Sequence, residues 1–157
     1  MPRRKGISPV IATVIIVAVT IAVAIAVAFW MTGIVGLFTS VEKLEITYAY
    51  AEKGTNNWTV TIAVNNTGTT PTSIDRIMIN GVDISTCSSS AVGTVSVSGG
   101  TSTSLPVTLN PGKGVKISFD IYQGQDCGTT TFSPGVSIEV KLHSTGGKEY
   151  PKLLTLP

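Results

Sequence analysis

The chain has 157 residues, of which 13% are charged, and its net charge is +2. This length is enough for one modest domain with an appendage. The positive balance comes from Arg3, Arg4 and Lys5, because the remainder carries eight basic against nine acidic side chains. No basic surface for nucleic acid is therefore expected, and the basic N-terminus is expected to stay on the cytoplasmic side of a membrane.

An apolar stretch without a charged residue follows this basic N-terminus. Ser8 fits a helix N-cap and Pro9 fits the first helical turn, where its missing N–H costs no hydrogen bond. The run over 10–31 is long enough to cross the ~30 Å core of a bilayer. Apolar residues continue at helical spacing beyond it. We predict a leader over residues 1–6 and one hydrophobic assembly or transmembrane helix over residues 7–44.

From residue 44 onward the apolar period changes to two, which predicts half-buried strands. Turn signals such as Asn80-Gly81 separate these segments. The fold class predicted is α+β, with the long N-terminal helix followed by an all-β immunoglobulin-like sandwich over residues 45–157. The Ser/Thr-rich segment 85–106 is predicted as a surface loop or weak edge strands. The predicted strands are 44–52, 57–66, 74–80, 114–122, 135–144 and 148–156.

Two cysteines, Cys87 and Cys127, lie in the β-rich part. An even number in a chain with an export signal favours a disulfide, and the alternative is two unpaired buried side chains. Their spacing matches no metal-binding motif, and His143 is the single histidine, so no metal or other cofactor is expected. The carboxylates are scattered and His143 lies on a predicted exposed strand face. We therefore expect no catalytic residues and no enzymatic activity.

Two triplets match the N-glycosylation sequon, and they make Asn57 and Asn65 the candidate acceptors. The alternative is that both are ordinary strand-edge and turn asparagines. Trp58 lies inside the first sequon and is expected in the core rather than in a binding site.

Four interpretations compete for the N-terminal segment. A general secretory signal has a shorter apolar core, and a lipoprotein signal needs a nearby cysteine. A single-pass anchor fits the length but leaves the apolar continuation over 32–44 unexplained. The fourth interpretation rests on the letters "RRKG" at 3–6 followed by "ISPVI" at 7–11. This pattern closely resembles the class III signal peptide of archaeal type IV pilins, a branch of the pilin and archaellin superfamily.

The resemblance covers residues 1 to about 45, and it implies cleavage by a prepilin peptidase between Gly6 and Ile7, directly after Lys5. Bacterial pilins carry glutamate at the fifth mature position, which is Ile11 here. Archaeal pilins usually lack that glutamate, so the difference favours the archaeal branch.

The resemblance implies a major pilin, the structural subunit of an extracellular adhesive filament. Its partners would be copies of itself, the prepilin peptidase, and the pilus assembly ATPase with its membrane platform. The chain would lie in the cytoplasmic membrane before assembly and in a cell-surface filament afterwards. The helix is apolar all round and carries small residues, namely Ala12, Ala18, Ala22, Ala24, Ala26, Ala28, Gly33 and Gly36, that allow close helix approach. The residues expected to form the helical core of the filament are Val10, Ile11, Val14, Ile15, Val17, Ala18, Ile21, Ala22, Ile25, Phe29, Trp30, Ile34, Leu37 and Phe38.

Two alternatives remain open at this point. The chain could be a membrane-anchored binding domain on the cell surface, or an archaellin of a motility filament. The apolar continuation beyond Met31 favours a filament subunit over a simple anchor.

Overall fold

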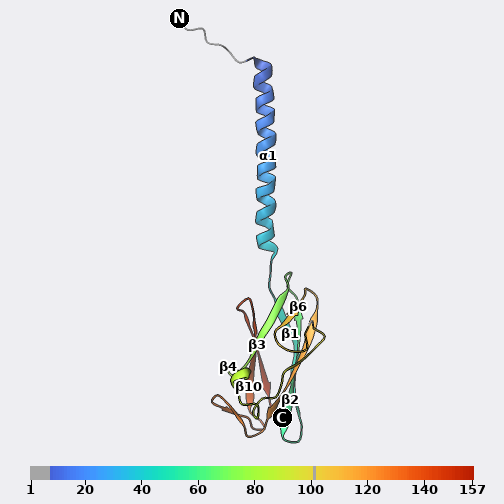
Figure 1. Ribbon diagram of the computed structural model, residues 1–157, viewed down its shortest axis with the longest axis vertical. Helices are drawn as coiled ribbons and strands as arrows, with labels where there is room; N and C mark the ends of the chain where they lie inside the picture. Colours follow the sequence, from blue (N-terminus) through green and yellow to red (C-terminus); the bar gives the residue numbers. More distant parts are fainter. Residues whose placement is uncertain (1–7, 101) are drawn as a thin grey trace. The chain divides into compact units, whose positions relative to one another are not determined.

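The computed structural model describes residues 8–100 and 102–157. They divide into two compact units, one ending at Ser40 and the other formed by Val41–Pro157. The predicted class, an N-terminal helix followed by a β-sandwich, is confirmed (Figure 1). The elements are α1 Pro9–Thr39, β1 Leu44–Lys53, β2 Asn57–Asn66, β3 Thr72–Ile79, β4 Val82–Asp83, η1 Ile84–Thr86, β5 Ser96–Ser98, β6 Val107–Leu109, β7 Gly114–Tyr122, β8 Asp126–Cys127, β9 Thr130–Thr131, β10 Ser137–Ser144 and β11 Glu149–Thr155.

The helix α1 begins at Pro9, as the Ser8-Pro9 signal indicates, although the Ser8 side chain makes no capping hydrogen bond, and it ends earlier than predicted. Ser8 precedes it with extended backbone angles and Pro9 is its first residue. It ends at Thr39, whereas the sequence pattern extends it to residue 44. The apolar side chain of Leu44 therefore belongs to β1 and lies buried in the sandwich core.

The helix ends early because the residues that follow it form hydrogen bonds with the loop after β2. The backbone N–H of Val41 donates to Thr69 Oγ1 at 2.9 Å, and the Thr69 N–H donates to the Val41 carbonyl at 2.8 Å. The N–H groups of Thr67 and Gly68 donate to the Lys43 carbonyl at 2.9 and 3.0 Å. These backbone groups are thus satisfied by the loop after β2, which replaces the helical hydrogen bonds that a longer α1 would make.

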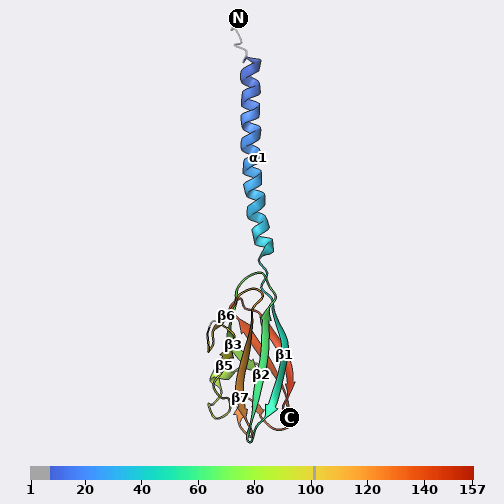
Figure 2. The same ribbon diagram turned by 90° about the vertical axis from the view of Figure 1, so that its right-hand side faces the viewer.

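Two antiparallel sheets form the sandwich. One has the strand order β1-β2-β7-β5, and Figure 2 shows β1, β2 and β7 side by side in it. The other has the order β11-β10-β3-β4, with β6 also paired to β3. Inward residues alternate along β2, β7 and β10 and form one core. The fully buried large side chains are Trp58, Ile62, Ile74, Ile77, Ile79, Leu109, Ile117, Ile121, Phe132, Ile138, Leu142 and Leu156.

The predicted disulfide between Cys87 and Cys127 is present. Cys87 follows the short helix η1 and Cys127 lies in β8, with the two Cα atoms 5.1 Å apart. That separation lies in the usual range for bridged cysteines. The bond therefore ties the start of the Ser/Thr-rich segment to the β8–β9 hairpin.

Replacing both cysteines by serine is expected to lower the free energy of unfolding of the sandwich by about 2–4 kcal/mol, because the bond closes a loop of 40 residues in the unfolded chain. Urea denaturation of the full-length chain in detergent measures this change. Reductant should destabilise the original chain by a similar amount and leave the double variant unchanged. Equal stability of the two chains in oxidising buffer would contradict the prediction.

Candidate assembly interface

The helix α1 presents apolar side chains on every side. It carries no charged residue, and none of its described side chains is buried within the chain. Phe29 and Phe38 are 75% and 80% exposed. At ~1.5 Å per residue, a helix of 31 residues is about 46 Å long, which exceeds the ~30 Å core of a bilayer. Such a surface needs an apolar environment on all sides, either lipid or other helices.

The few polar side chains in α1 are satisfied within the helix. Each threonine hydroxyl donates to the backbone carbonyl three residues earlier, at distances between 2.8 and 3.1 Å. Each of these hydroxyls therefore keeps its hydrogen bond when the helix is buried in an apolar environment, which keeps the free-energy cost of burying the threonines low. The threonines are Thr13, Thr20, Thr32 and Thr39.

The structure places thirteen of the predicted assembly residues on α1 with described side chains; the side chain of the fourteenth, Leu37, lies outside the described part. Twelve of the thirteen are exposed, and Ile34 is half-buried. A side chain added at Gly33 or Gly36 would meet only open space within the chain. These glycines are therefore not required for packing inside the subunit. The predicted cleavage residues Lys5, Gly6 and Ile7 lie outside the described residues.

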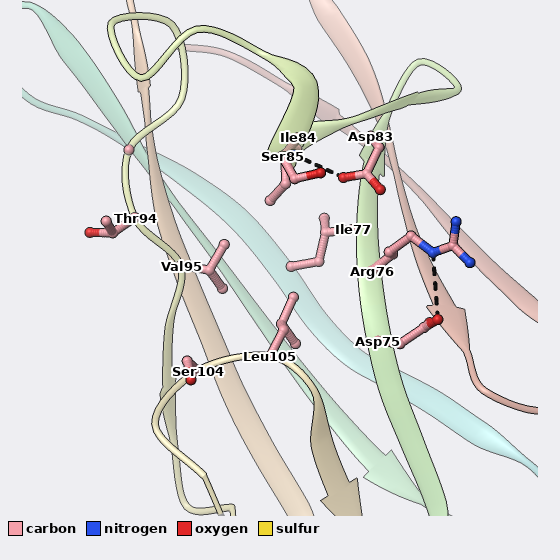
Figure 3. Close-up of a pocket in the computed structure, with 11 residues that line it drawn as sticks. Asp75, Arg76, Ile77, Asp83, Ile84, Ser85, Thr94, Val95, Ser104 and Leu105 are labelled. Carbon is pink, nitrogen blue, oxygen red and sulfur yellow. Dashed lines mark hydrogen bonds and ion pairs between the residues drawn. The ribbon is translucent and has the colours of Figure 1, made fainter.

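A depression of about 450 Å³ lies between β3 and the segment 93–105 of the sandwich. Ile77, Val95 and Leu105 supply apolar lining, while Arg76 and Asp75 extend on the other side of β3 from Val95 (Figure 3). Asp83 accepts a hydrogen bond from the Ser85 N–H at 2.8 Å and so caps η1. The arrangement is that of an apolar hollow beside β3, and its carboxylates have structural partners. Across residues 8–100 and 102–157, no three histidine, cysteine, aspartate or glutamate side chains group as metal ligands do.

His143 is paired, which the sequence did not indicate. Its Nδ1 lies 2.7 Å from Asp75 Oδ1, and Arg76 Nε lies 3.5 Å from Asp75 Oδ2. His143 and Arg76 are register partners of β10 and β3, and a bulge beside them places Asp75 next to the ring. The pair joins two central strands on the outer face of their sheet. Burial raises the pKa of Asp75, but the hydrogen bond from His143 and the charges of His143 and Arg76 outweigh it, so the pKa lies below its ordinary value.

Replacing Asp75 by asparagine is expected to remove about 1 kcal/mol of stability at neutral pH and to flatten the acid side of the stability curve. Because the folded pKa is lowered, the contribution of Asp75 is complete above the ordinary carboxyl pKa of 3.8 and is lost as the pH falls through the folded pKa. Urea midpoints of both chains between pH 7 and pH 2 test this. The two curves should converge at the acidic end; a constant difference at all pH values would contradict the assignment.

The two sequon asparagines occupy different settings on β2. Asn57 is half-buried and lies over Gly54, and the next residue, Trp58, is 1% exposed. Asn65 is exposed at the other end of the strand and lies over Gly114. Sequence reasoning ranked the two equally, because burial and strand register are not visible in a triplet.

Comparisons with known proteins leave the family open. No protein-family model matches this sequence, and the search of curated proteins gave no match. The apo PCuAC domain from PmoF1 is 14% identical, covers 74% of this chain and 98% of its own, and superposes with a TM-score of 0.46. The Iho670 flagellar-like filament structure is 13% identical, covers 95% of this chain and 98% of its own, and gives a TM-score of 0.35. At these TM-scores neither similarity establishes a function.

Proposed function

We propose that this chain is a pilin-like structural subunit that polymerises through its N-terminal helix. The observation that carries the proposal is α1 itself, which is apolar on every side, carries no charge and is longer than a bilayer is thick. Copies of the helix can bury one another on all faces, and each fully buried large apolar side chain contributes about 1.5–3 kcal/mol relative to water. The sandwich then forms the outer wall.

The finer proposal is a major pilin of an extracellular archaeal type IV adhesive pilus. It rests on the leader and helix opening at 3–11, where removal of three positive charges frees the N-terminus from the cytoplasmic side of the membrane. A subunit that contacts its neighbours head to tail builds an open helical polymer. The prepilin peptidase, the assembly ATPase and its membrane platform are the partners that such an assembly requires.

A membrane-anchored binding domain is the competing function, because the span Pro9–Gly36 is also long and apolar enough to cross a membrane. The end of α1 at Thr39 shortens the apolar continuation that argues against an anchor. Still, 31 helical residues exceed the ~20 that a span needs. An archaellin shares these helix features. Experiments on cells are therefore needed to decide between a role in motility and a role in adhesion.

The deciding experiment is intact mass and N-terminal sequencing of material sheared from cells. We expect a chain beginning at Ile7 in a fraction that sediments at high mass. Full-length protein beginning at Met1, found in the membrane fraction and missing from sheared material, would overturn the pilin proposal and favour the anchored domain. Loss of surface attachment without loss of swimming in a deletion strain would then separate an adhesive pilus from an archaellin.

A further inference from the structure

The strands β1, β2 and β7 lie side by side in one sheet (Figure 2). A shallow depression lies on the outer face of this sheet. It measures about 370 Å³. Ala63 on β2 carries only a methyl group and leaves the floor low, and the Asn65 side chain lies over Gly114. Tyr48 borders the depression on β1 and Lys116 borders it on β7. Asn65 is part of the same lining, so a sequon asparagine stands at the edge of a hollow bordered by an aromatic ring.

Tyr48 forms half of an exposed aromatic pair. Its ring stacks on that of Tyr50 with centroids 5.9 Å apart and an angle of 24° between the planes. The two residues are 41% and 40% exposed, although aromatic side chains of this size are usually covered. A bulge between Ile46 and Tyr48 shifts the register of β1 and sets Tyr48 opposite Ala63, two residues from Asn65 on the same face of β2.

We propose that Asn65, and not Asn57, carries an N-linked glycan whose first sugars pack on the Tyr48–Tyr50 pair. The C–H groups on the apolar face of a pyranose ring carry partial positive charge, and the face of a tyrosine ring carries partial negative charge. The small side chain of Ala63 leaves room for the sugar beside that face. The hydroxyls point to solvent and to Lys116 at the far border of the depression.

The modification is a glycosyl transfer with a lipid-phosphate-linked sugar as the co-reactant. Asn65 Nδ2 forms a bond to C1 of the sugar and loses one proton. The bond between C1 and the phosphate oxygen breaks, and the lipid phosphate leaves with its electron pair. This proposal rests on one part of the proposed function, namely that the sandwich is exported from the cell. The lipid-linked sugar and the folded sandwich that carries Asn65 must meet outside the cytoplasm.

Asn57 serves as the matched comparison within the same strand. Both asparagines lie over a glycine, but Asn57 is half-buried where Asn65 is exposed. The Thr59 hydroxyl of the Asn57 sequon donates to Asp120 Oδ1 at 2.7 Å in a partly buried pair. Tyr122 lies opposite Asn57 on β7 and is 36% exposed, but it belongs to no stacked pair among the described residues. The protein thus offers one sequon beside an aromatic pair and one beside a single ring.

Mass spectrometry of the chain recovered from its own cells tests the site. Trypsin cleaves at Lys53 and Arg76 and leaves both sequons in one peptide, so fragmentation that retains the sugar is needed to assign it. We expect the whole mass increment on Asn65, complete loss of it in Asn65→Gln, and an unchanged mass increment in Asn57→Gln. Sugar on Asn57 alone, or no sugar on a chain that labelling of intact cells shows to be exported, overturns this proposal and leaves the proposed function standing. A chain that stays inside the cell overturns both.

A thermal double-mutant cycle on the full-length chain in detergent tests the packing. Tyr48→Ala should lower the melting temperature of the glycosylated chain more than that of the Asn65→Gln chain, because the sugar contact exists only in the first. Tyr122→Ala should lower both equally. Equal effects of Tyr48→Ala with and without the glycan would overturn the packing on the tyrosine pair.

Discussion

Replacing Ala22 and Ala26 together by leucine is expected to abolish filaments while the chain stays anchored in the membrane. The two alanines are four residues apart in α1 and lie on one face of the helix. Leucine is a good helix former and is more apolar than alanine, so both the helix and its membrane insertion are retained. The added volume separates helices that approach through small residues. An overpacked contact costs about 1–3 kcal/mol, which lowers the association constant of each subunit contact by roughly five- to 150-fold.

The measurement compares the share of the chain in sheared, sedimentable material with the share in the membrane fraction. Val23→Leu with Val27→Leu is the matched control, because it has the same spacing on the helix and adds less volume at each position. Filaments at the original level in the alanine variant would mean that the helices do not pack through this face. A binding domain held by a simple anchor would show no difference between the two variants.

The segments in which apolar and smaller residues alternate predict most of the sandwich strands. Trp58, Val60, Ile62 and Val64 alternate with two threonines and an alanine, and in the structure all four are buried on the inner face of β2. The same holds for the inward residues of β7 and β10. A period of two is readable because one face of each strand meets the core and the other meets solvent.

The short strands β4, β6, β8 and β9 were not predicted, because two or three residues cannot show a period. Each is defined by pairing to a distant or neighbouring segment, as β6 is by its register with β3. The end of α1 was predicted too late for a similar reason. Val41 has helical spacing in the sequence, but its backbone bonds to Thr69, a contact that no local pattern contains.

The candidate sites divide in the same way. The apolar helix and the sequons are local signals, and the disulfide follows from the even number of cysteines in a chain with an export signal. The Asp75–His143 pair and the border of the depression by Tyr48 depend on strand register between segments. Strand register is determined by the whole sheet. The sequence therefore identified the residue types but could not predict which residues lie next to each other across the strands.

Replacing Trp58 by alanine is expected to destabilise the sandwich by about 3–5 kcal/mol, a large share of the ~5–15 kcal/mol that holds a typical domain folded. Trp58 is 1% exposed, and its Nε1–H donates to the carbonyl oxygen of Pro157 at 2.7 Å. The substitution leaves a cavity in the core and removes the hydrogen bond that attaches the C-terminal residue to β2. The urea dependence of hydrogen exchange in β2 and β7 measures the loss on the full-length chain.

Trp30→Ala is the control, since it makes the same change at a helix position that is 68% exposed. It should leave exchange in β2 and β7 unchanged. Trp58→Phe separates the two contributions to the Trp58 effect, because phenylalanine retains most of the apolar volume and lacks the indole N–H. We expect the phenylalanine variant to lose clearly less stability than the alanine variant. Normal exchange in Trp58→Ala would mean that the core does not depend on this ring, which would reopen a binding role for Trp58.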